Sequence, residues 1–270
     1  MNQPAQSISQ PVARSADAPS SGARDGLTRF SGRADDYARY RPGYPAELID
    51  VFLQGLDRSR CVVADMGAGT GISSVAIAGQ LQGSAKVIAV EPNEAMLAKA
   101  VANARVEYVC ARAEQSGLSD ASVDAVGCFQ AFHWLEPARS LDEFARISRP
   151  GCQVGFVWND RDDREPATAA LSRVLALHNA DPRARFACDA HRPLVESSLF
   201  ERYSLHEYLS QRCMTETELL GWTQSMSTTP QGGCALERFA ADIKGVFAGH
   251  SQNGRITIAM SAHLHLAFRL

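Results

Sequence analysis

The stretch Cys61-Val62-Val63-Ala64-Asp65-Met66-Gly67-Ala68-Gly69-Thr70-Gly71 decides the fold of this chain. It predicts a buried strand, an acidic residue, a glycine-rich turn and the start of a helix. Glycines let a backbone approach a ligand at positions where any Cβ would clash. The helix that follows directs its free N–H groups at that ligand. The stretch therefore predicts a binding site for a nucleotide-type cofactor.

Two details of the turn separate the candidate cofactors. A dinucleotide-binding turn has the pattern G-x-G-x-x-G, but here the third glycine, Gly71, comes one residue early and Ile72 stands at the expected position. Asp65 lies two residues before Gly67, and a carboxylate there is unfavourable beside a pyrophosphate but suits a cation. The pattern D-x-G-x-G-x-G resembles motif I of the class I S-adenosylmethionine-dependent methyltransferases. Their cofactor carries a sulfonium, an ammonium and a carboxylate, and no phosphate.

The composition is that of an ordinary globular protein. The chain has 270 residues, a net charge of −3 and seven widely spaced cysteines with no C-x-x-C pair. The arginines are scattered, so we expect no nucleic-acid partner, and the cysteines indicate a reducing compartment, with neither a disulfide framework nor a zinc knuckle. No apolar run approaches the roughly 20 residues of a membrane span. These features predict a cytoplasmic protein without a membrane partner; they carry no signal for its oligomeric state.

The first 26 residues are rich in Ser, Ala, Gln, Pro and Gly and lack the apolar stretch of a signal peptide. A transit peptide is an alternative, because Arg14 and Arg24 lie among serines, but Asp17, Asp25 and three prolines argue against it. We expect residues 1–26 to be a disordered tail.

Strands and helices are predicted to alternate along most of the remaining chain. Strands are expected at about 61–65, 86–91, 106–110, 123–128, 152–158, 203–209 and 256–268, and helices at about 45–53, 71–82, 94–104, 141–148, 168–179, 215–225 and 235–247. Thr70 is a plausible cap of the second helix. Strands that alternate with helices indicate βαβ units and a parallel sheet. The strict alternation of apolar residues near the C-terminus predicts a long last strand.

The end of the second strand offers a partner for a ribose. Glu91 follows Gly67 by 24 residues, and a carboxylate at this place can accept two hydrogen bonds from a ribose diol. The alternative is a surface glutamate before Pro92. Met96, one turn into the next helix, would cover an adenine or simply pack in the core. The spacing from the glycine turn favours the binding role for Glu91.

Two further loops follow strands of the predicted sheet. After the third strand, Ala113 and Glu114 occupy the place from which the resembling enzymes contact the adenine edge, and the alternative is an exposed loop glutamate. After the fourth strand come Gln130, His133 and Trp134, at the end of a parallel sheet that faces a ligand crevice. Gln130 could bond the amino-acid part of the cofactor. His133 could accept a substrate proton, since an imidazole titrates near pH ~6.5; the alternative is that His133 and Trp134 only shape the pocket.

A wider set of motifs is similar to the type 11 methyltransferase group. It comprises Phe30, Tyr37, the run Tyr40-Arg41-Pro42-Gly43-Tyr44-Pro45, the turn 65–71, Val90-Glu91-Pro92 with Met96, Ala113-Glu114, Gln130-Ala131-Phe132-His133-Trp134, and Arg149-Pro150-Gly151 through Trp158-Asn159. The group includes ubiquinone-pathway C-methyltransferases and trans-aconitate O-methyltransferase-like enzymes, and the aromatic pieces favour the second branch. The resemblance covers about residues 28–160 well and the last hundred loosely. Gly151-Cys152 departs from the usual Gly-Gly.

The resemblance implies a fold and a set of site residues. The fold is α/β, a Rossmann-like doubly wound, mostly parallel seven-stranded sheet with an antiparallel C-terminal strand. Residues 27–270 would be the methyltransferase domain, with 27–45 as an N-terminal lid segment and 161–200 as a substrate-side insertion. The cofactor S-adenosylmethionine would contact Tyr37, Arg41, Asp65, Gly67, Ala68, Gly69, Glu91, Pro92, Met96, Ala113, Glu114 and Gln130, with Arg41 near its carboxylate. The substrate would contact Phe30, Trp134, Trp158 and Trp222, and His133 is the candidate catalytic residue.

His263 and His265 place two imidazoles on one face of the last strand. No third ligand is near them in sequence and the spacings typical of zinc sites are absent, so we expect no metal.

The expected reaction is in-line transfer of a methyl group from S-adenosylmethionine to an oxygen or nitrogen atom of a small molecule. Positioning and exclusion of water would supply most of the catalysis. Two alternatives remain open at this point: a methyltransferase that acts on RNA or protein, which the absence of a basic patch disfavours, and a non-catalytic protein that binds the cofactor.

Overall fold

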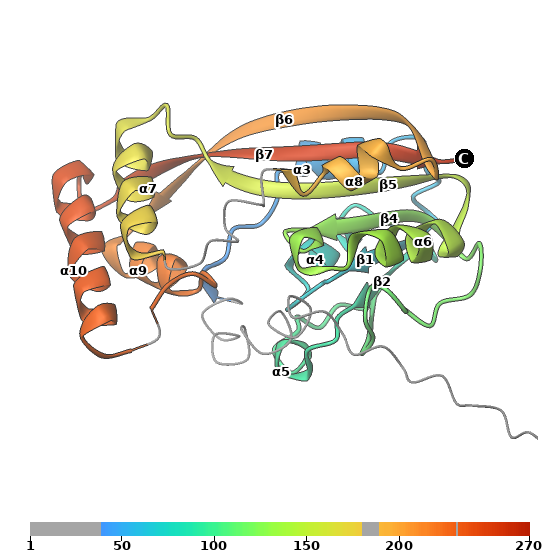
Figure 1. Ribbon diagram of the computed structural model, residues 1–270, viewed down its shortest axis with the longest axis horizontal. Helices are drawn as coiled ribbons and strands as arrows, with labels where there is room; N and C mark the ends of the chain where they lie inside the picture. The colour runs from blue at the N-terminus through green and yellow to red at the C-terminus, as the bar shows by residue number, and fades with distance from the viewer. Residues whose placement is uncertain (1–38, 180–188, 231) are drawn as a thin grey trace, which may run out of the picture.

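The parallel sheet predicted from the sequence is present in the computed structural model, which describes residues 39–179, 189–230 and 232–270. Its strands are β1 (Val62–Met66), β2 (Lys86–Val90), β3 (Val106–Val109), β4 (Val123–Phe129), β5 (Ser148–Arg161), β6 (Phe200–Met214) and β7 (Ile256–Arg269). They lie in the order β3-β2-β1-β4-β5-β7-β6. β7 runs antiparallel to both β5 and β6, and the other neighbouring strands are parallel. The doubly wound fold with an antiparallel C-terminal strand is therefore confirmed (Figure 1).

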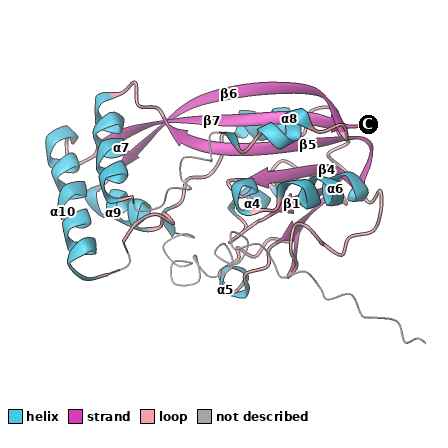
Figure 2. Cartoon of the chain, viewed as in Figure 1, coloured by secondary structure: helices cyan, strands magenta, loops and turns pink. Residues whose placement is uncertain are grey.

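Helices cover both faces of this sheet and form a group of their own at one end of it. They are α3 (Ala46–Phe52), α4 (Ile72–Ala78), α5 (Glu94–Leu97), η1 (Phe132–Trp134), α6 (Pro137–Ile147), α7 (Pro166–His178), α8 (Arg192–Glu196), α9 (Glu216–Gln224) and α10 (Gly233–His250). Figure 2 shows α7, α9 and α10 gathered beyond the left end of the parallel strands, where the long β6 and β7 reach them. Among the described helices, none is long and apolar enough to cross a membrane.

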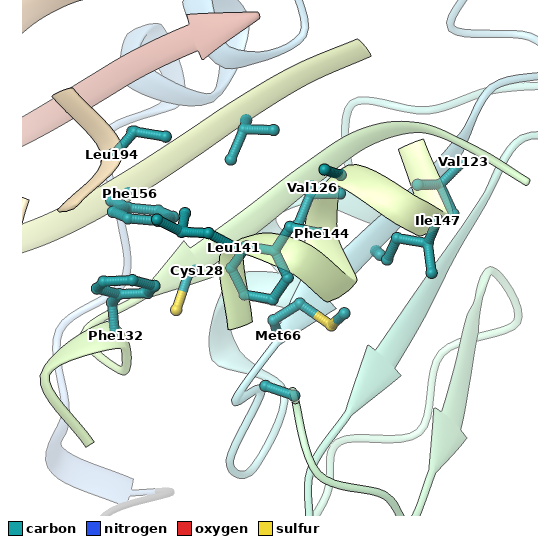
Figure 3. Packing of buried hydrophobic residues seen from close by; sticks show 14 of the residues in the cluster. Met66, Val123, Val126, Cys128, Phe132, Leu141, Phe144, Ile147, Phe156 and Leu194 are labelled. Carbon is teal, nitrogen blue, oxygen red and sulfur yellow. The ribbon is translucent and has the colours of Figure 1, made fainter. Parts of the chain in front are cut away.

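The first core lies between the sheet and helices α6 and α8. Met66, Val126 and Phe156 of the sheet meet Phe144 of α6 and Phe132 of η1 (Figure 3). The rings of Phe132 and Phe156 stack with centroids 4.1 Å apart, a contact worth about 1 kcal/mol beyond its buried area. This packing fixes η1, and with it the loop that leaves β4.

Two further cores complete the molecule. On the opposite face of the sheet, Phe52 of α3 and Ile77 of α4 pack on Val63 and Leu264. The third core lies at the end of β7, where Ile258 and its neighbours are covered by α7, α9 and α10. The central strands are buried from both sides, and their near-continuous apolar sequences are typical of that position.

Two details of the predicted elements were wrong. The helix expected at 94–104 is only the four-residue α5, because the chain beyond it turns back and Val101 N donates to Thr70 O. Thr70 is not the cap of α4; Gly71 takes that position with φ +83°. In both cases a tertiary contact with the glycine turn outweighs the local preference of the sequence.

Gly71 shows why the third glycine comes early. A Cβ at this position would collide with the Tyr108 hydroxyl, which is held by a 2.8 Å hydrogen bond to Val101 O. The left-handed backbone also disfavours any other residue. Gly71 is therefore required by the packing of β3 across the turn.

We predict that Gly71→Ala lowers the free energy of unfolding by about 2–5 kcal/mol, as the sum of a left-handed backbone penalty of ~1–2 and an overpacking cost of ~1–3 kcal/mol. Gly117→Ala is the matched control, because Gly117 also has positive φ but no atom near its added Cβ; it should cost the backbone term alone. Urea unfolding of both variants measures the difference. Equal losses would contradict the role of Tyr108.

Candidate active site

The glycine turn lies against the loop that follows β4. Gly67, at φ +76°, approaches Ala131 so closely that an added Cβ would lie 2.6 Å from the Ala131 Cβ. The N–H groups of Gly67 and Ala68 donate to Val90 O at 2.8 and 3.1 Å, which also ties the turn to β2. The ends of β1, β2 and β4 thus meet at the carboxyl edge of the sheet, where ligands bind in open α/β folds.

Asp65 is a fully buried carboxylate at the end of β1. Its Oδ2 accepts hydrogen bonds from the Ser73 and Ser74 hydroxyls at 2.6 and 2.5 Å, whereas its Oδ1 is buried with no partner among the described residues. Burial raises the pKa of Asp65 to about 6, although the two hydroxyls act in the opposite direction. A buried acceptor without a donor is costly, so Oδ1 fits a cofactor that brings a hydrogen-bond donor or a positive charge.

Glu91 joins two loops through its carboxylate. Oε2 accepts from Gly69 N at 2.9 Å and Oε1 from Asn93 N at 2.8 Å. Burial raises the pKa of Glu91, and the nearby Asp65 charge acts in the same direction. Each carboxylate oxygen has more than one acceptor site, so Glu91 can hold the turn and still accept from a ribose diol.

A cavity opens between the turn and the loop after β4. It is small, and it is lined by Arg41, Pro42, Tyr44, Gly67, Ala68, Ile72, Ser73, Phe129, Gln130 and Asn159. Gln130 adopts φ +55°, a conformation uncommon outside glycine that often marks functional loops. Its Nε2 donates to Asn159 O at 3.0 Å, which fixes the side chain at the cavity wall.

The N-terminal segment 39–45 is fastened across this end of the sheet by three hydrogen bonds. Asn159 Nδ2 donates to Gly43 O at 3.1 Å, and Arg212 donates to Tyr40 O at 3.2 Å. Arg41 in turn donates to Ser225 O, just after α9, at 3.3 Å. The segment therefore connects the sheet with the helical group and closes one side of the cavity.

Three guanidinium groups give this side of the site a positive charge. Burial lowers the pKa of both Arg161 and Arg212, and the Arg41 charge lowers each of them further. Arg161 and Arg212 lie on strands that flank β7, at neighbouring rungs. The charges of Asp163 and Asp160 act to raise the pKa of Arg161, and that of Glu218 acts to raise the pKa of Arg212, so both arginines have acidic neighbours as well. Arg41 is the arginine of these three that lines the cavity, and its charge suits the carboxylate of a cofactor.

His133 lies in η1, next to the loop that carries Gln130. Its Nδ1 accepts a hydrogen bond from the Trp158 indole N–H at 3.3 Å. Burial lowers the pKa of His133 to about 4, and the positive charge of Arg41 contributes. The ring is therefore neutral at physiological pH.

The predicted site residues fall into four sets. Arg41, Gly67, Ala68 and Gln130 line the cavity, and Asp65, Gly69 and Glu91 support its wall. Met96, Ala113, Trp158 and Trp222 are buried in the protein, and Glu114 accepts from Glu136 N at 3.0 Å and pairs with Arg112. Phe30 and Tyr37 lie outside the described residues. Pro92 and Trp134 are partly exposed and do not line the cavity; the binding roles of all these residues stay predictions.

Sequence reasoning missed Tyr44, Phe129 and Asn159 as parts of the cavity wall. Tyr44 and Phe129 meet edge to face with centroids 4.9 Å apart, and Asn159 binds both Gly43 and Gln130. A signal was available for Asn159, because it follows Trp158 at the carboxyl end of a strand that borders the ligand crevice.

Comparison with known proteins finds similarity to methyltransferases. Residues 64–156 match the family model described as a methyltransferase domain. The chain is 38% identical over 160 residues to an uncharacterized methyltransferase of Mycobacterium tuberculosis. The matched region is 59% of this chain and 63% of the relative. An uncharacterized methyltransferase-like protein of Schizosaccharomyces pombe is 29% identical over 72% of this chain and 75% of its own length. The fold matches a protein of Anaeromyxobacter dehalogenans, provisionally assigned as a type II methyltransferase, with a TM-score of 0.63 and 24% identity over 85% of this chain and 97% of that one.

Residues 64–156 are similar to a methyltransferase domain, and the curated relatives that the chain matches are named as methyltransferases. The fold is shared with a solved structure of the same description. The trans-aconitate-like branch stays a prediction. The chain spans slightly less than two thirds of the mycobacterial relative.

We predict that Asp65→Asn raises the free energy of unfolding at pH 7, by up to about 3 kcal/mol, while it weakens cofactor binding. The folded protein holds the Asp65 proton up to about pH 6 and the unfolded chain releases it near the ordinary value of 3.8, so the charged side chain costs stability as the pH rises through this window. The gain should shrink toward pH 4, where the wild-type carboxyl is protonated in the fold.

Urea unfolding at pH 4 and pH 7 tests this. Asp142→Asn is the control, since Asp142 is exposed on α6 and makes no hydrogen bond or ion pair in the described part of the chain. A variant less stable than wild type at pH 7 would show that the Asp65 charge supports the fold.

Proposed function

We propose that this protein transfers the methyl group of S-adenosylmethionine to an oxygen or nitrogen atom of a small molecule. The observation that carries the proposal is that Gly67 and Ala68 of the glycine turn line one cavity together with Arg41 and Gln130, while Asp65 binds the cavity residue Ser73 and Glu91 binds Gly69 of the same turn. When bound, the cofactor supplies a methyl group: the acceptor lone pair forms a bond to the methyl carbon as the carbon–sulfur bond breaks, and that electron pair stays on sulfur. The protein's part is to bind, orient and exclude water.

The residues in and around the cavity are placed to contact different parts of the cofactor, according to their charge. Glu91 is placed to accept from the ribose hydroxyls, and the free Oδ1 of Asp65 to accept from a donor of the cofactor. Arg41 and Gln130 are placed for the amino-acid part. The positive charge of the sulfonium is lost as the methyl group is transferred, and the cationic Arg41 would not stabilise that charge before the transfer.

A small acceptor is favoured by the way the site is closed. Arg41, Pro42 and Tyr44 form one wall of the cavity, and the hydrogen bonds from Asn159 and Arg212 hold their backbone in place. A wall of this kind leaves limited room for a folded macromolecule beside the cofactor. We propose that the segment 27–45 acts as a lid and that 161–200 borders the acceptor, as the sequence suggested.

The binding step is tested by calorimetry with S-adenosylhomocysteine. We predict that Glu91→Gln raises the dissociation constant about 10–100-fold, because it weakens hydrogen bonds to a charged acceptor worth ~1.5–3 kcal/mol. Glu107→Gln is the control, since Glu107 lies on the adjacent β3 and pairs with Lys86 on the surface. Unchanged affinity in Glu91→Gln would remove Glu91 from the cofactor site.

The lid segment is tested at Arg41. Arg41→Gln should raise the dissociation constant of S-adenosylhomocysteine about tenfold, because the guanidinium lines the cavity and a charge-assisted contact to a carboxylate is lost. Arg39→Gln, two residues earlier and outside the cavity wall, should bind as the wild type does. Equal behaviour of the two variants would exclude a role of Arg41 toward the cofactor.

Methyl transfer is tested with cofactor labelled on its methyl group. The protein is incubated with panels of carboxylic acids and amines and, in separate reactions, with total RNA and total protein. Label in a small acid or amine supports the proposal. Label in RNA or protein would replace it with the macromolecular alternative, and tight cofactor binding without transfer to any panel would favour a non-catalytic role.

A further inference from the structure

We propose that His133 serves as a neutral hydrogen-bond donor that positions the methyl acceptor, with its proton fixed on Nε2 by Trp158, and that it does not act as a general base. This inference rests on the proposed function, since it names a residue that would meet the acceptor. It assigns to Trp158 the role of a positioning residue.

The tautomer of His133 follows from its partner. An indole N–H can only donate, and it points at His133 Nδ1 at 3.3 Å, so Nδ1 must carry a lone pair. A neutral imidazole with a lone pair on Nδ1 carries its hydrogen on Nε2. A protonated ring would place two N–H groups face to face and lose the Trp158 bond. The contact therefore selects one tautomer and opposes uptake of a second proton.

Trp158 is held too firmly to turn away from this bond. It is buried, with its ring edge to face against Phe156 at 6.2 Å and His265 at 5.5 Å. His265 is itself fixed, because Tyr203 Oη lies 2.8 Å from its Nδ1 and the His191 ring stacks on it with centroids 4.2 Å apart. This row of rings leads from α8 across the end of the sheet to His133.

The other nitrogen of His133, Nε2, has no hydrogen-bond partner in the described part of the chain. It is not among the buried polar atoms there that lack a partner. Arg41 is the charged side chain that acts on the ring, and the Trp134 ring lies beside it at 5.0 Å. Arg41 and Gln130 line the cavity, and His133 lies three residues after Gln130 and within the electrostatic reach of Arg41, so we place the Nε2–H donor at this side of the site. It would bind an acceptor through an oxygen that carries a lone pair, such as that of a carboxylate, a phosphate or a carbonyl.

A donor at this place has a chemical consequence. His133 takes up no proton during transfer, so the reacting atom must either carry none, as in a carboxylate, or release it to water after the new bond has formed, as an amine nitrogen does. Acceptors that need a proton removed before attack, such as aliphatic alcohols, would be poor substrates.

The tautomer is tested without any turnover. Long-range proton–nitrogen NMR spectra of the protein labelled with ¹⁵N-histidine and bound to S-adenosylhomocysteine report which ring nitrogen carries hydrogen, and the His133 signals are assigned with His133→Gln. We expect a neutral ring with hydrogen on Nε2 that does not titrate between pH 5.5 and 8. Titration in this range, or hydrogen on Nδ1, would overturn the proposal. In Trp158→Phe, which keeps the ring packing but not the N–H, the single tautomer should be lost.

The role in transfer is tested with an acceptor found in the labelling panels. His133→Gln keeps an N–H donor but cannot take a proton, and His133→Leu keeps neither. We expect the glutamine variant to retain kcat/KM within about threefold and the leucine variant to lose about tenfold or more. The ratio of wild-type to glutamine rates should stay constant from pH 5.5 to 8. Equal losses in both variants, or a ratio that rises with pH, would identify His133 as a base.

The two proposals fail in different ways. If no acceptor is found, the methyl-transfer proposal fails and the NMR measurement still decides the tautomer. If transfer occurs and the His133 ring titrates, the methyl-transfer proposal is supported and the proposed donor role of His133 is wrong.

Discussion

The close approach of Gly67 to Ala131 sets the geometry of the whole site. The turn after β1 and the loop after β4 can lie side by side because Gly67 has no Cβ that would collide with the Cβ of Ala131. Glu91, after β2, binds Gly69 N of the same turn, and Gln130 lies in the loop beside it. The aromatic packing of Phe132 on Phe156 holds the loop after β4 in place. The ends of β1, β2 and β4 thus meet at one edge of the sheet.

Acidic and basic side chains lie on opposite sides of this edge of the sheet. The carboxylates of Asp65 and Glu91 lie on the side of β1 and β2, where burial keeps them reluctant to ionise and ready for a donor. Arg161 of β5 and Arg212 of β6 lie on the other side, and Arg41 of the segment 39–45 lies near both. Between them His133 is kept neutral. A charged ligand is thereby oriented by the field of the site before any contact at the reacting atom.

The sequence predicted the parts of the site that depend on local pattern. Asp65, the glycine turn and Glu91 are close in sequence to the strands that present them, so spacing alone placed them correctly at the carboxyl edge. The contacts of segment 39–45 with Asn159, Arg212 and Ser225 could not be foreseen, because they join residues 116 to 184 positions apart. The shortened α5 has the same cause, since its continuation is diverted by Thr70. The burial of Asp65 Oδ1 without a partner and the Trp158–His133 hydrogen bond also depend on tertiary packing. The spacing of apolar residues along the sequence does not predict such contacts.

The long β6–β7 pair carries a third hydrophobic core that is separate from the two cores of the parallel sheet. The third core, built by α7, α9 and α10 on Ile256, Ile258 and Met260, shares none of its buried side chains with the two cores that hold the cofactor loops. Structural units with their own core can open and reclose on their own. Opening of the helical group can therefore leave the turn at 67–71 in its folded shape. A loss of stability in α7, α9 and α10 would then stay at that end of the molecule, away from the loops at the carboxyl edge of the sheet.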